Sequence, residues 1–264
     1  MVGSSGAHSA VWHRRHSDLN NHTRRADPKN ELYLRMARFA ELVGPTHIVI
    51  ENVPAVVHDK NKVVQRTIRA LEDLGYNVDS SLVEMKKIGV PQGRRRHVVV
   101  ASKSNVISIA SSLARYAGRP RSVGWVLEDL LDARAEGIFD SPSVATAVNK
   151  QRIDYLFEHD LLDLPDKLRP ECHREGGHSY KSVYGRLHWD LPAQTITSGF
   201  GSMGQGRYVH PKRRRTITPH EAARIQFIPD HFKWGDIART ALAEMIGNAV
   251  PPKVTYILAL ELLR

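Results

Sequence analysis

The chain has 264 residues, of which 41% are hydrophobic and 25% charged, a composition that is ordinary for a globular protein of one large or two small domains. No apolar run approaches the roughly 20 residues of a membrane span, no signal-peptide core is present, and a single cysteine, Cys172, excludes an internal disulfide framework. The formal net charge of +10 predicts a polyanionic partner, with nucleic acid as the first expectation.

The positive charges are clustered along the chain. "GRRRH" covers residues 93–97 and "KRRR" covers 212–215. A basic solvated surface is the alternative that charge alone leaves open. Clusters favour contact with phosphates, which would make binding steeply dependent on salt.

The first recognisable elements are a helix and a strand. "ADPKNELYLRMARFAELVG" predicts a helix with Asp27 as N-cap, Pro28 at its first position and Gly44 at its end. The β-branched run that follows predicts a strand over 46–53, buried on both faces of a parallel sheet. This strand delivers Glu51 at its C-terminal end, where ligands bind in open α/β sheets.

A second helix and two further strands follow. "KNKVVQRTIRALEDLGYNV" is a helix pattern whose buried face is formed by four apolar residues, Val63, Ile68, Leu71 and Leu74. "SSLVEMKKIGVPQGRRRHVVVASK" predicts two strands around a Gly-Val-Pro-Gln loop. Helix, strand, helix, strand, strand predicts an α/β fold, as a fragment of a parallel sheet with an antiparallel edge.

The chain changes character after residue 103. Short helical patterns alternate with loops rich in Pro, Gly and His up to about residue 185, which predicts a small irregular domain. The last stretch, "EMIGNAVPPKVTYILALELLR", predicts an apolar helix that begins at Pro251 and packs against the sheet.

Four separated stretches carry a family resemblance. They are "ENV" at 51–53, "GVPQGRRR" at 89–96, "YGRLHWDLPAQTIT" at 184–197 with "RTITPHEAARIQFIPDHF" at 215–232, and "IGNAVPP" at 246–252. In this order they resemble the DNA (cytosine-5) methyltransferases. The resemblance implies a partial Rossmann-like, S-adenosylmethionine-dependent methyltransferase sheet plus a small irregular target-recognition domain.

The same resemblance implies domain boundaries. Residues 16–103 correspond to the C-terminal half of the catalytic α/β domain, 104–232 to the target-recognition region, and 233–264 to a helix returning to the catalytic domain. Double-stranded DNA is then the expected partner, S-adenosyl-L-methionine the cofactor, and a bacterial-type cytosol or nucleoid the location.

The resemblance also assigns catalytic and base-side roles. In this family a cysteine thiolate adds to C6 of a flipped cytosine, and C5 then takes the methyl group. Glu51 would clamp N3 and the exocyclic amine of the base, with Asn52 beside it. Gln92, Arg94 and Arg96 occupy alternate positions and so share one face of a strand, while Arg95 points away.

The remaining expected site residues lie in the second half of the chain. Those expected to organise the recognition region and contact DNA are Arg186, Trp189, Thr195, Thr197 and Arg207. Asn248 and Ala249 would approach the methionine end of the cofactor. Glu221 and Arg224 are spaced to form a structural i, i+3 pair.

Some motifs of the family are missing. The Gly-rich cofactor loop, the acid for the ribose and the Pro-Pro-Cys nucleophile loop are not found in this sequence. Cys172 cannot replace the nucleophile, because it follows Glu51 in the chain instead of preceding it. With His173 and His178 it makes three candidate ligands, fewer than a structural zinc site needs, so no metal site is expected.

Residues 1–15 match nothing in the family pattern. One choice of codons for residues 9–14, shifted by one base, encodes Pro-Pro-Cys-Gly-Ile, which predicts that this segment is an out-of-frame start on a truncated or frameshifted gene. We therefore expect a methyltransferase fragment that is inactive alone. The alternatives are one subunit of a split methyltransferase, whose second polypeptide supplies the missing motifs, and a non-catalytic DNA-binding remnant.

Overall fold

The computed structural model describes residues 33–174 and 182–264, which form two compact units. The sheet unit holds residues 33–84, 95–116 and 256–264, and the second unit holds 85–94 and 117–255 apart from the gap at 175–181. The expectations for residues 1–15, for the cap at Asp27 and Pro28, and for His178 lie outside the described residues. Each unit is described below by itself.

The sheet unit is built on three strands, β1 (His47–Asn52), β2 (Asn77–Glu84) and β3 (Arg95–Ser102), in the order β1-β3-β2. Both outer strands pair with β3 in the antiparallel sense. The expected antiparallel strand is therefore present, but it lies in the middle of the three and not at an edge. The helical crossover between β1 and β2 keeps them in the same direction, and the short connection after β2 returns the chain as β3 between them.

Burial follows this strand order. In β3 every residue after Arg95 is buried, whereas β1 buries Ile48 and Ile50 and leaves Val49 38% exposed. The expectation that β1 is buried on both faces was thus wrong for the described residues. The strand whose side chains are buried on both faces is the central one, β3, which lies between β1 and β2.

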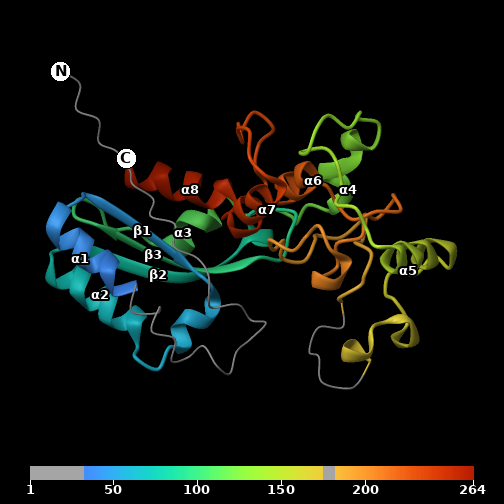
Figure 1. Cartoon of the computed structure of the whole chain (residues 1–264). Coiled ribbons are helices and arrows are strands. Elements are labelled where there is room, and N and C mark those ends of the chain that lie inside the picture. Colours follow the sequence, from blue (N-terminus) through green and yellow to red (C-terminus); the bar gives the residue numbers. More distant parts are fainter. Residues whose placement is uncertain (1–32, 175–181) are drawn as a thin grey trace. The chain divides into compact units, whose positions relative to one another are not determined.

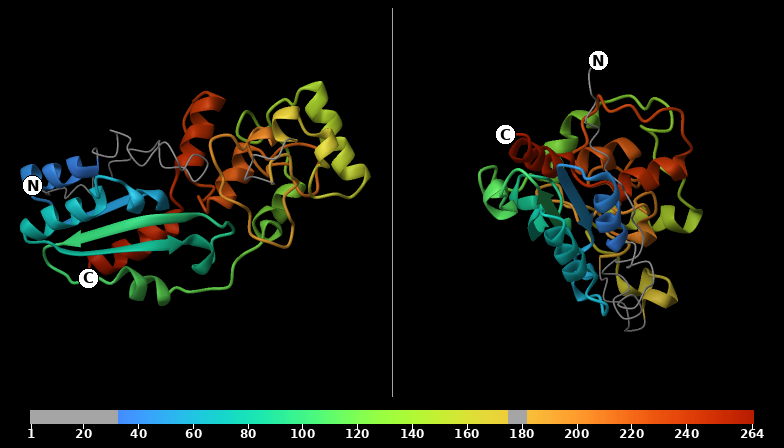
Figure 2. Two further views of the ribbon diagram at one scale, coloured as in Figure 1. Left: turned by 90° about the horizontal axis from the view of Figure 1, so that it is seen from below. Right: turned by 90° about the vertical axis from the view of Figure 1, so that its left-hand side faces the viewer.

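Two helices cover one face of the sheet. α1 (Leu34–Val43) ends at Gly44, whose φ of 60° is the left-handed conformation that closes many helices, as expected. α2 (Val63–Asp73) buries Val63 and Leu71 completely, while Ile68 and Leu74 pack partly buried on the same core. Figures 1 and 2 show α1 and α2 on one side of the strands, and α3 (Ile109–Ala114) with the last turns of α8 (Pro252–Leu262) on the other.

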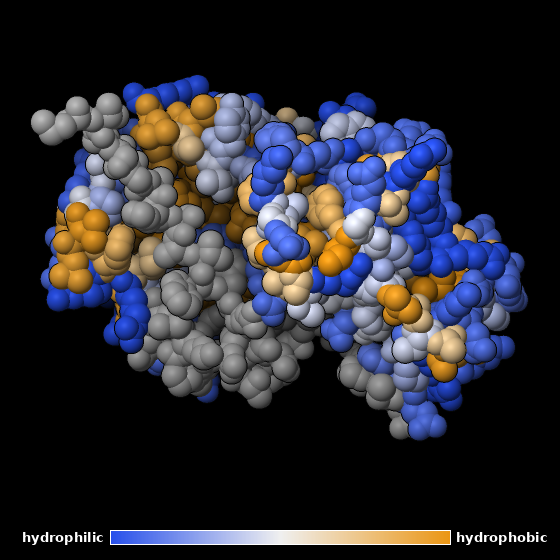
Figure 3. Space-filling model, turned by 45° about the horizontal axis from the view of Figure 1, so that its top comes forward, coloured by the Kyte–Doolittle hydropathy of each residue, from blue (hydrophilic) through white to orange (hydrophobic). Residues whose placement is uncertain are grey.

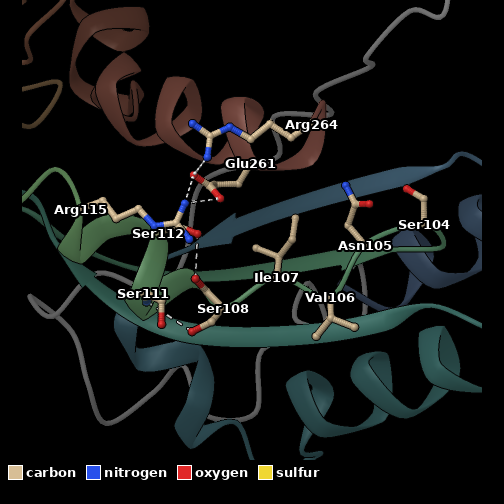
Figure 4. A pocket seen from close by; sticks show the side chains of 10 residues that line it. All are labelled: Ser104, Asn105, Val106, Ile107, Ser108, Ser111, Ser112, Arg115, Glu261 and Arg264. Carbon is tan, nitrogen blue, oxygen red and sulfur yellow. Dashed lines mark hydrogen bonds and ion pairs between the residues drawn. The ribbon is translucent and has the colours of Figure 1, made fainter.

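A hollow of about 500 Å³ opens between the segment 104–115 and the end of α8. Its charged side chains are paired with one another: Arg115 forms two hydrogen bonds of 2.9 and 3.0 Å with the Glu261 carboxylate, which Arg264 also contacts (Figure 4). Ser108 uses its hydroxyl to cap α3 at the backbone N–H of Ser111. Each charged side chain that lines the hollow is therefore already engaged in an ion pair.

The second unit is helical and irregular. Its described residues form no strand, only isolated bridges such as Arg186 with Val209. Its α-helices are α4 (Val123–Leu127), α5 (Ala147–Glu158), α6 (Pro219–Ile225) and α7 (Arg239–Asn248). Its 3₁₀ turns are η4 (Met85–Lys87), η5 (Glu128–Leu131), η6 (Asp166–Leu168), η7 (Glu171–His173) and η8 (Met203–Gln205), and η3 (Pro54–His58) belongs to the sheet unit.

Two apolar clusters hold the second unit together. One joins α4, α6 and α7, and the other packs α5 against residues around Val183 and Val209. α6 begins with a capping box, in which Thr218 and Glu221 each accept a hydrogen bond from the other's backbone N–H. The fold as a whole is mixed α/β, and no helix among the described residues is long and apolar enough to span a membrane.

Candidate active site

Glu51 and Arg96 form an ion pair on neighbouring strands of the sheet unit. Glu51 is paired in register with Val98, which places Arg96 two residues away on the same face, within diagonal reach. The guanidinium Nε lies 2.5 Å from Oε1 of Glu51, and both side chains are only about one-tenth exposed. The carboxylate is therefore held in one orientation at the C-terminal end of β1.

Tyr33 lies near this pair, immediately before α1. Its ring is buried, and its hydroxyl has no hydrogen-bond partner among the residues that the structure describes. Burial raises the pKa of Tyr33, and the negative charge of Glu51 raises it further. The hydroxyl therefore keeps its proton and remains a potential donor inside the sheet unit.

Asn52 has a local structural contact. Its side-chain Oδ1 accepts a hydrogen bond of 2.8 Å from the backbone N–H of Val53, at the turn into η3. The expected alternation downstream is also present: Gln92, Arg94 and Arg96 are buried, and Arg95 is exposed. Of these residues only Arg95 and Arg96 belong to β3, because the first two lie in the loop that precedes it.

A buried glutamine, Gln226, connects three of the sequence motifs. Its Oε1 accepts hydrogen bonds from Gln92 Nε2 at 2.6 Å and from Arg94 Nε at 3.4 Å. Its Nε2 donates to the carbonyl of Ile246 at 2.6 Å and to that of Ala249 at 3.4 Å. The "PQGRRR" loop, the end of α6 and the "IGNAV" turn are thus joined through one fully buried amide.

Arg94 is the most deeply buried arginine among the described residues, at 1% exposed. Its terminal nitrogen donates to the carbonyl of Ile196 at 3.3 Å and to that of Gly247. Gln92 completes this buried network by accepting a hydrogen bond from the backbone N–H of Ile196 at 3.3 Å. In this arrangement Arg94 positions backbone segments within the second unit.

The turn expected to meet the cofactor is packed tightly. A Cβ on Gly247 would lie 2.1 Å from the backbone nitrogen of Ser198, so only glycine fits there. Asn248 is the last residue of α7, and Ala249 caps it with a backbone N–H that bonds to Met245 and Ile246. Both residues are half-buried, so their backbone is fixed while one side remains accessible.

Two arginines expected to contact DNA are paired with aspartates. Arg186 lies 2.6 Å from Asp160, and Arg207 lies 2.5 Å from Asp163. Arg207 is buried and also donates to the carbonyls of Leu162 and Arg186, at 3.0 Å each. Its guanidinium therefore joins three loop segments of the second unit.

Thr195 and Thr197 are organised by Tyr208. The phenol donates to the carbonyl of Thr195 at 3.1 Å and lies 2.9 Å from the hydroxyl of Thr197. The Trp189 ring lies against Gly124, where a Cβ would approach it to 2.6 Å. Lys212 stacks its ammonium 3.7 Å from the Trp189 ring centroid.

Glu221 and Arg224 do not pair with each other, contrary to the expectation. Arg215 binds both carboxylate oxygens of Glu221 at 2.7 Å, while Arg224 binds Asp129 and Asp230. Glu221 faces the loop that carries Arg215 because its capping role turns it toward the start of α6. Arg215 belongs to the basic cluster at 212–215 in the sequence, but its charge is engaged in an ion pair within the second unit.

His210 is buried beside this pair, with Nε2 3.4 Å from Oε1 of Glu221. Burial lowers the pKa of His210 to about 4, since the nearby arginines and Lys212 also disfavour its charged form while Glu221 opposes the shift. Burial alone would raise the pKa of Glu221, but the Arg215 hydrogen bonds and neighbouring positive charges lower it overall. Near neutral pH the cluster therefore holds a neutral imidazole and an ionised carboxylate.

Known proteins are similar to this chain over most of its length. The model of the C-5 cytosine-specific DNA methylases matches residues 16–264. The chain belongs to this family. It is 50% identical over 249 residues to the type II methyltransferase M1.BsuMI of Bacillus subtilis, which covers 94% of this chain and 58% of that protein. With the type II methylase M.HgiDII of Herpetosiphon aurantiacus it shares 33% identity, over 94% of this chain and 73% of the relative.

Solved structures show the same fold. S. pombe Dnmt2 methyltransferase matches with a TM-score of 0.60 and 17% identity, over 90% of this chain and 73% of that one. The Entamoeba histolytica methyltransferase EhMeth matches with a TM-score of 0.56 and 16% identity, over 90% and 69%. In length, the chain spans little more than half of its 50%-identical relative, M1.BsuMI.

Several structural residues were not singled out by the sequence reasoning. Gln226, Gly247, Tyr33 and His210 each fill a buried position. The only sequence signal for Gln226 is an amide between apolar residues in "ARIQFI", where a surface residue would be equally acceptable. No cluster of three or more potential metal ligands occurs in the described ranges 33–174 and 182–264.

Proposed function

We propose that this chain carries the C-terminal part of a cytosine-5 DNA methyltransferase, which transfers a methyl group to C5 of cytosine in double-stranded DNA. The observation that carries the proposal is the Glu51–Arg96 pair at the end of β1, in a chain of this family. We further propose that residues 16–103 form the second half of a Rossmann-like catalytic sheet. In this proposal 104–232 form the target-recognition region, and 233–264 return to the catalytic domain.

In the proposed reaction Glu51 binds the flipped cytosine at N3 and at its exocyclic amine. A hydrogen bond or proton at N3 withdraws electrons from the ring and makes C6 susceptible to a nucleophile. Arg96 holds the carboxylate in place and keeps it from rotating toward solvent. Tyr33 is buried near enough to Glu51 for the carboxylate charge to raise its pKa.

Gln92 and Arg94 lie in the loop that precedes β3. Their buried hydrogen bonds to Gln226, Ile196 and Gly247 support a role in fixing the loop that leads into β3. The contact of Arg94 with the target base stays a prediction. Asn52, Arg186, Thr195, Thr197 and Arg207 remain proposed DNA-side residues, whose present contacts shape the loops that would approach DNA.

S-adenosyl-L-methionine would supply the methyl group. Asn248 and Ala249 fit one end of this cofactor, because the tight Gly247 contact fixes a turn with an accessible amide. The sequence contains no Gly-rich loop or ribose acid at the expected places, so the fit is incomplete. The sequence likewise has no cysteine before Glu51 that could supply the thiolate, and no step of the reaction is assigned to either group.

The missing groups are proposed to come from a polypeptide that corresponds to the N-terminal part of the relatives. In a split methyltransferase this would be a second subunit acting in the same cytosol or nucleoid. The edge position of β1 supports this arrangement, since β1 pairs with β3 alone among the described strands and leaves Val49 exposed. A DNA-binding remnant without catalysis is the competing proposal.

Complementation tests the proposal. The chain is mixed with a polypeptide carrying the N-terminal 40% or so of the M1.BsuMI relative, and transfer of labelled methyl from S-adenosylmethionine to cytosine C5 is measured. Transfer that needs both polypeptides supports the split enzyme. DNA binding by the chain without any gain of transfer on mixing supports the remnant instead.

A further inference from the structure

Most arginines around the recognition loops have an acidic partner. Arg186, Arg207, Arg215 and Arg224 each bind a carboxylate within the second unit. This internal pairing reduces the positive charge that these residues present to a polyanion. Cations without such a partner therefore contribute most to the positive potential that attracts a polyanion.

Four other cations of the second unit behave differently. Lys86, Arg119 and Arg121 are exposed and Lys253 is half-buried, and none of the four lies within ion-pair distance of a carboxylate in the described part of the chain. Like charges without counter-charges repel one another, so such a group is favourable only where it serves an anionic ligand or is solvated.

These cations lie on neighbouring segments. The backbone N–H of Gly118 bonds to the carbonyl of Lys87 at 3.0 Å, which joins the segment carrying Lys86 to the one carrying Arg119 and Arg121. A Cβ at Gly89 would lie 3.6 Å from the Lys253 ammonium and 3.8 Å from the carbonyl of Arg119. The segments that carry the four cations are therefore neighbours in the second unit.

Two aromatic rings fix part of this surface. Trp125 and Phe227 stack with ring centroids 6.2 Å apart, and the Arg121 guanidinium lies 4.4 Å from the Trp125 ring centroid. Lys253 lies 5.8 Å from the Phe227 centroid. The rings thus hold two of the four positive charges in place without neutralising them.

The backbone of Phe227 has an unusual conformation. Phe227 has a φ of 64°, a left-handed conformation that a bulky residue adopts rarely and only where its surroundings impose it. The conformation places the ring against Trp125, which remains 51% exposed. Figure 3 shows hydrophobic residues at the surface as small areas among hydrophilic ones.

We propose that the Trp125 patch, formed by Lys86, Arg119, Arg121 and Lys253 around Trp125 and Phe227, binds the phosphate backbone of duplex DNA. The proposal rests on the proposed function only in taking DNA as the partner. It assigns DNA contact to residues other than Glu51 and other than the paired arginines of the recognition loops. Charge complementarity supports it, because unneutralised, preorganised cations are the groups that displace counterions from DNA.

The test measures how the affinity of the full chain for a labelled duplex depends on salt. The variant is Arg121→Gln/Lys253→Gln, which removes two positive charges from the patch. The matched control is Arg66→Gln/Arg69→Gln, which removes two exposed charges from α2 of the sheet unit. Each phosphate contact contributes about 0.9 to the slope of log affinity against log salt, so we expect the patch variant to lose nearly two units of slope.

The outcomes separate the two proposals. Equal slopes for the patch variant and the α2 control would overturn the patch, while the proposed function would stand if the unaltered chain still bound DNA. No salt-dependent binding by the unaltered chain would overturn the patch and the DNA partner together. Arg119→Gln, added to the patch variant, should lower the slope once more, and unchanged circular dichroism verifies that each variant is folded.

Discussion

Arg96 lies on the central strand β3 and places its Nε 2.5 Å from Oε1 of Glu51 on the neighbouring strand β1. The pair is almost completely shielded from water, which makes its attraction stronger than that of a surface ion pair. Shielding also makes each partner dependent on the other, because a single buried charge is strongly unfavourable.

The first prediction concerns this mutual dependence. Arg96→Met should lower the free energy of unfolding by about 3 kcal/mol, because it leaves the Glu51 carboxylate without its counter-charge. Glu51→Gln/Arg96→Met should be more stable than Arg96→Met alone, since no charge then remains uncompensated. Urea denaturation of both variants and of the Glu51→Gln single variant measures the coupling, and strictly additive effects would refute it.

A second prediction addresses the buried amide of Gln226. Gln226→Ala leaves Gln92, Arg94 and the carbonyl of Ile246 without hydrogen bonds that they now make, and we expect a loss of about 3 kcal/mol. Gln65→Ala, at an exposed position of α2, should change the unfolding free energy by less than about 0.5 kcal/mol. Similar urea midpoints for the two variants would mean that Gln226 does not connect the motifs energetically.

The close contact at Gly247 gives a third prediction. Gly247→Ala places a Cβ 2.1 Å from the backbone of Ser198, so α7 and that loop must separate, at a cost of about 3 kcal/mol. Gly118→Ala is the matched control, because a Cβ at Gly118 meets no atom within 4 Å. Thermal melting of both variants compares them, and a Gly247→Ala protein as stable as the control would contradict the packing described here.

The fourth prediction is a dependence of stability on pH. The pKa of His210 in the folded chain is about 4, below its ordinary value of 6.5, so the unfolded chain binds this proton more readily. Its contribution to stability is complete above pH 6.5 and is lost as the pH falls toward 4, by about 3 kcal/mol in total. The lowered pKa of Glu221 adds a further loss in more acidic solution.

His210→Gln should weaken this acid sensitivity between pH 6.5 and 4, as urea midpoints measured at several pH values would show. His159→Gln, at the exposed histidine that follows α5, serves as the control and should keep the full dependence. If His210→Gln retains the same dependence as the unaltered chain, the buried imidazole is not its source.

The sequence was most informative where one local signal decides the structure. Gly44 ends α1 because a left-handed residue is needed there, and the apolar spacing of α2 predicts which side chains are buried. The burial of alternate residues Gln92, Arg94 and Arg96 was also expected, although only Arg96 of the three lies in a strand. Each of these features depends on residues that are close together in the chain.

Features that depend on distant residues were harder to predict. Periodicity in β1 cannot reveal that β3 lies between β1 and β2, so the exposure of Val49 was missed. The i, i+3 spacing of Glu221 and Arg224 permits a pair, but Arg215, Asp129 and Asp230 offer better partners from other segments. The hydrogen bonds of Gln226 with Gln92 and Arg94 join residues more than one hundred positions apart and leave no local pattern.

The most direct measurement fuses residues 16–264 to the N-terminal part of the M1.BsuMI relative and records transfer of labelled methyl to cytosine C5, with and without Glu51→Gln. Arg95→Gln, at the exposed neighbouring arginine, is the control. Our account predicts that Glu51→Gln lowers the rate by at least about 100-fold while DNA binding is retained, and that the control stays active. A Glu51→Gln fusion that transfers methyl groups as fast as the unaltered fusion would contradict the role assigned to Glu51.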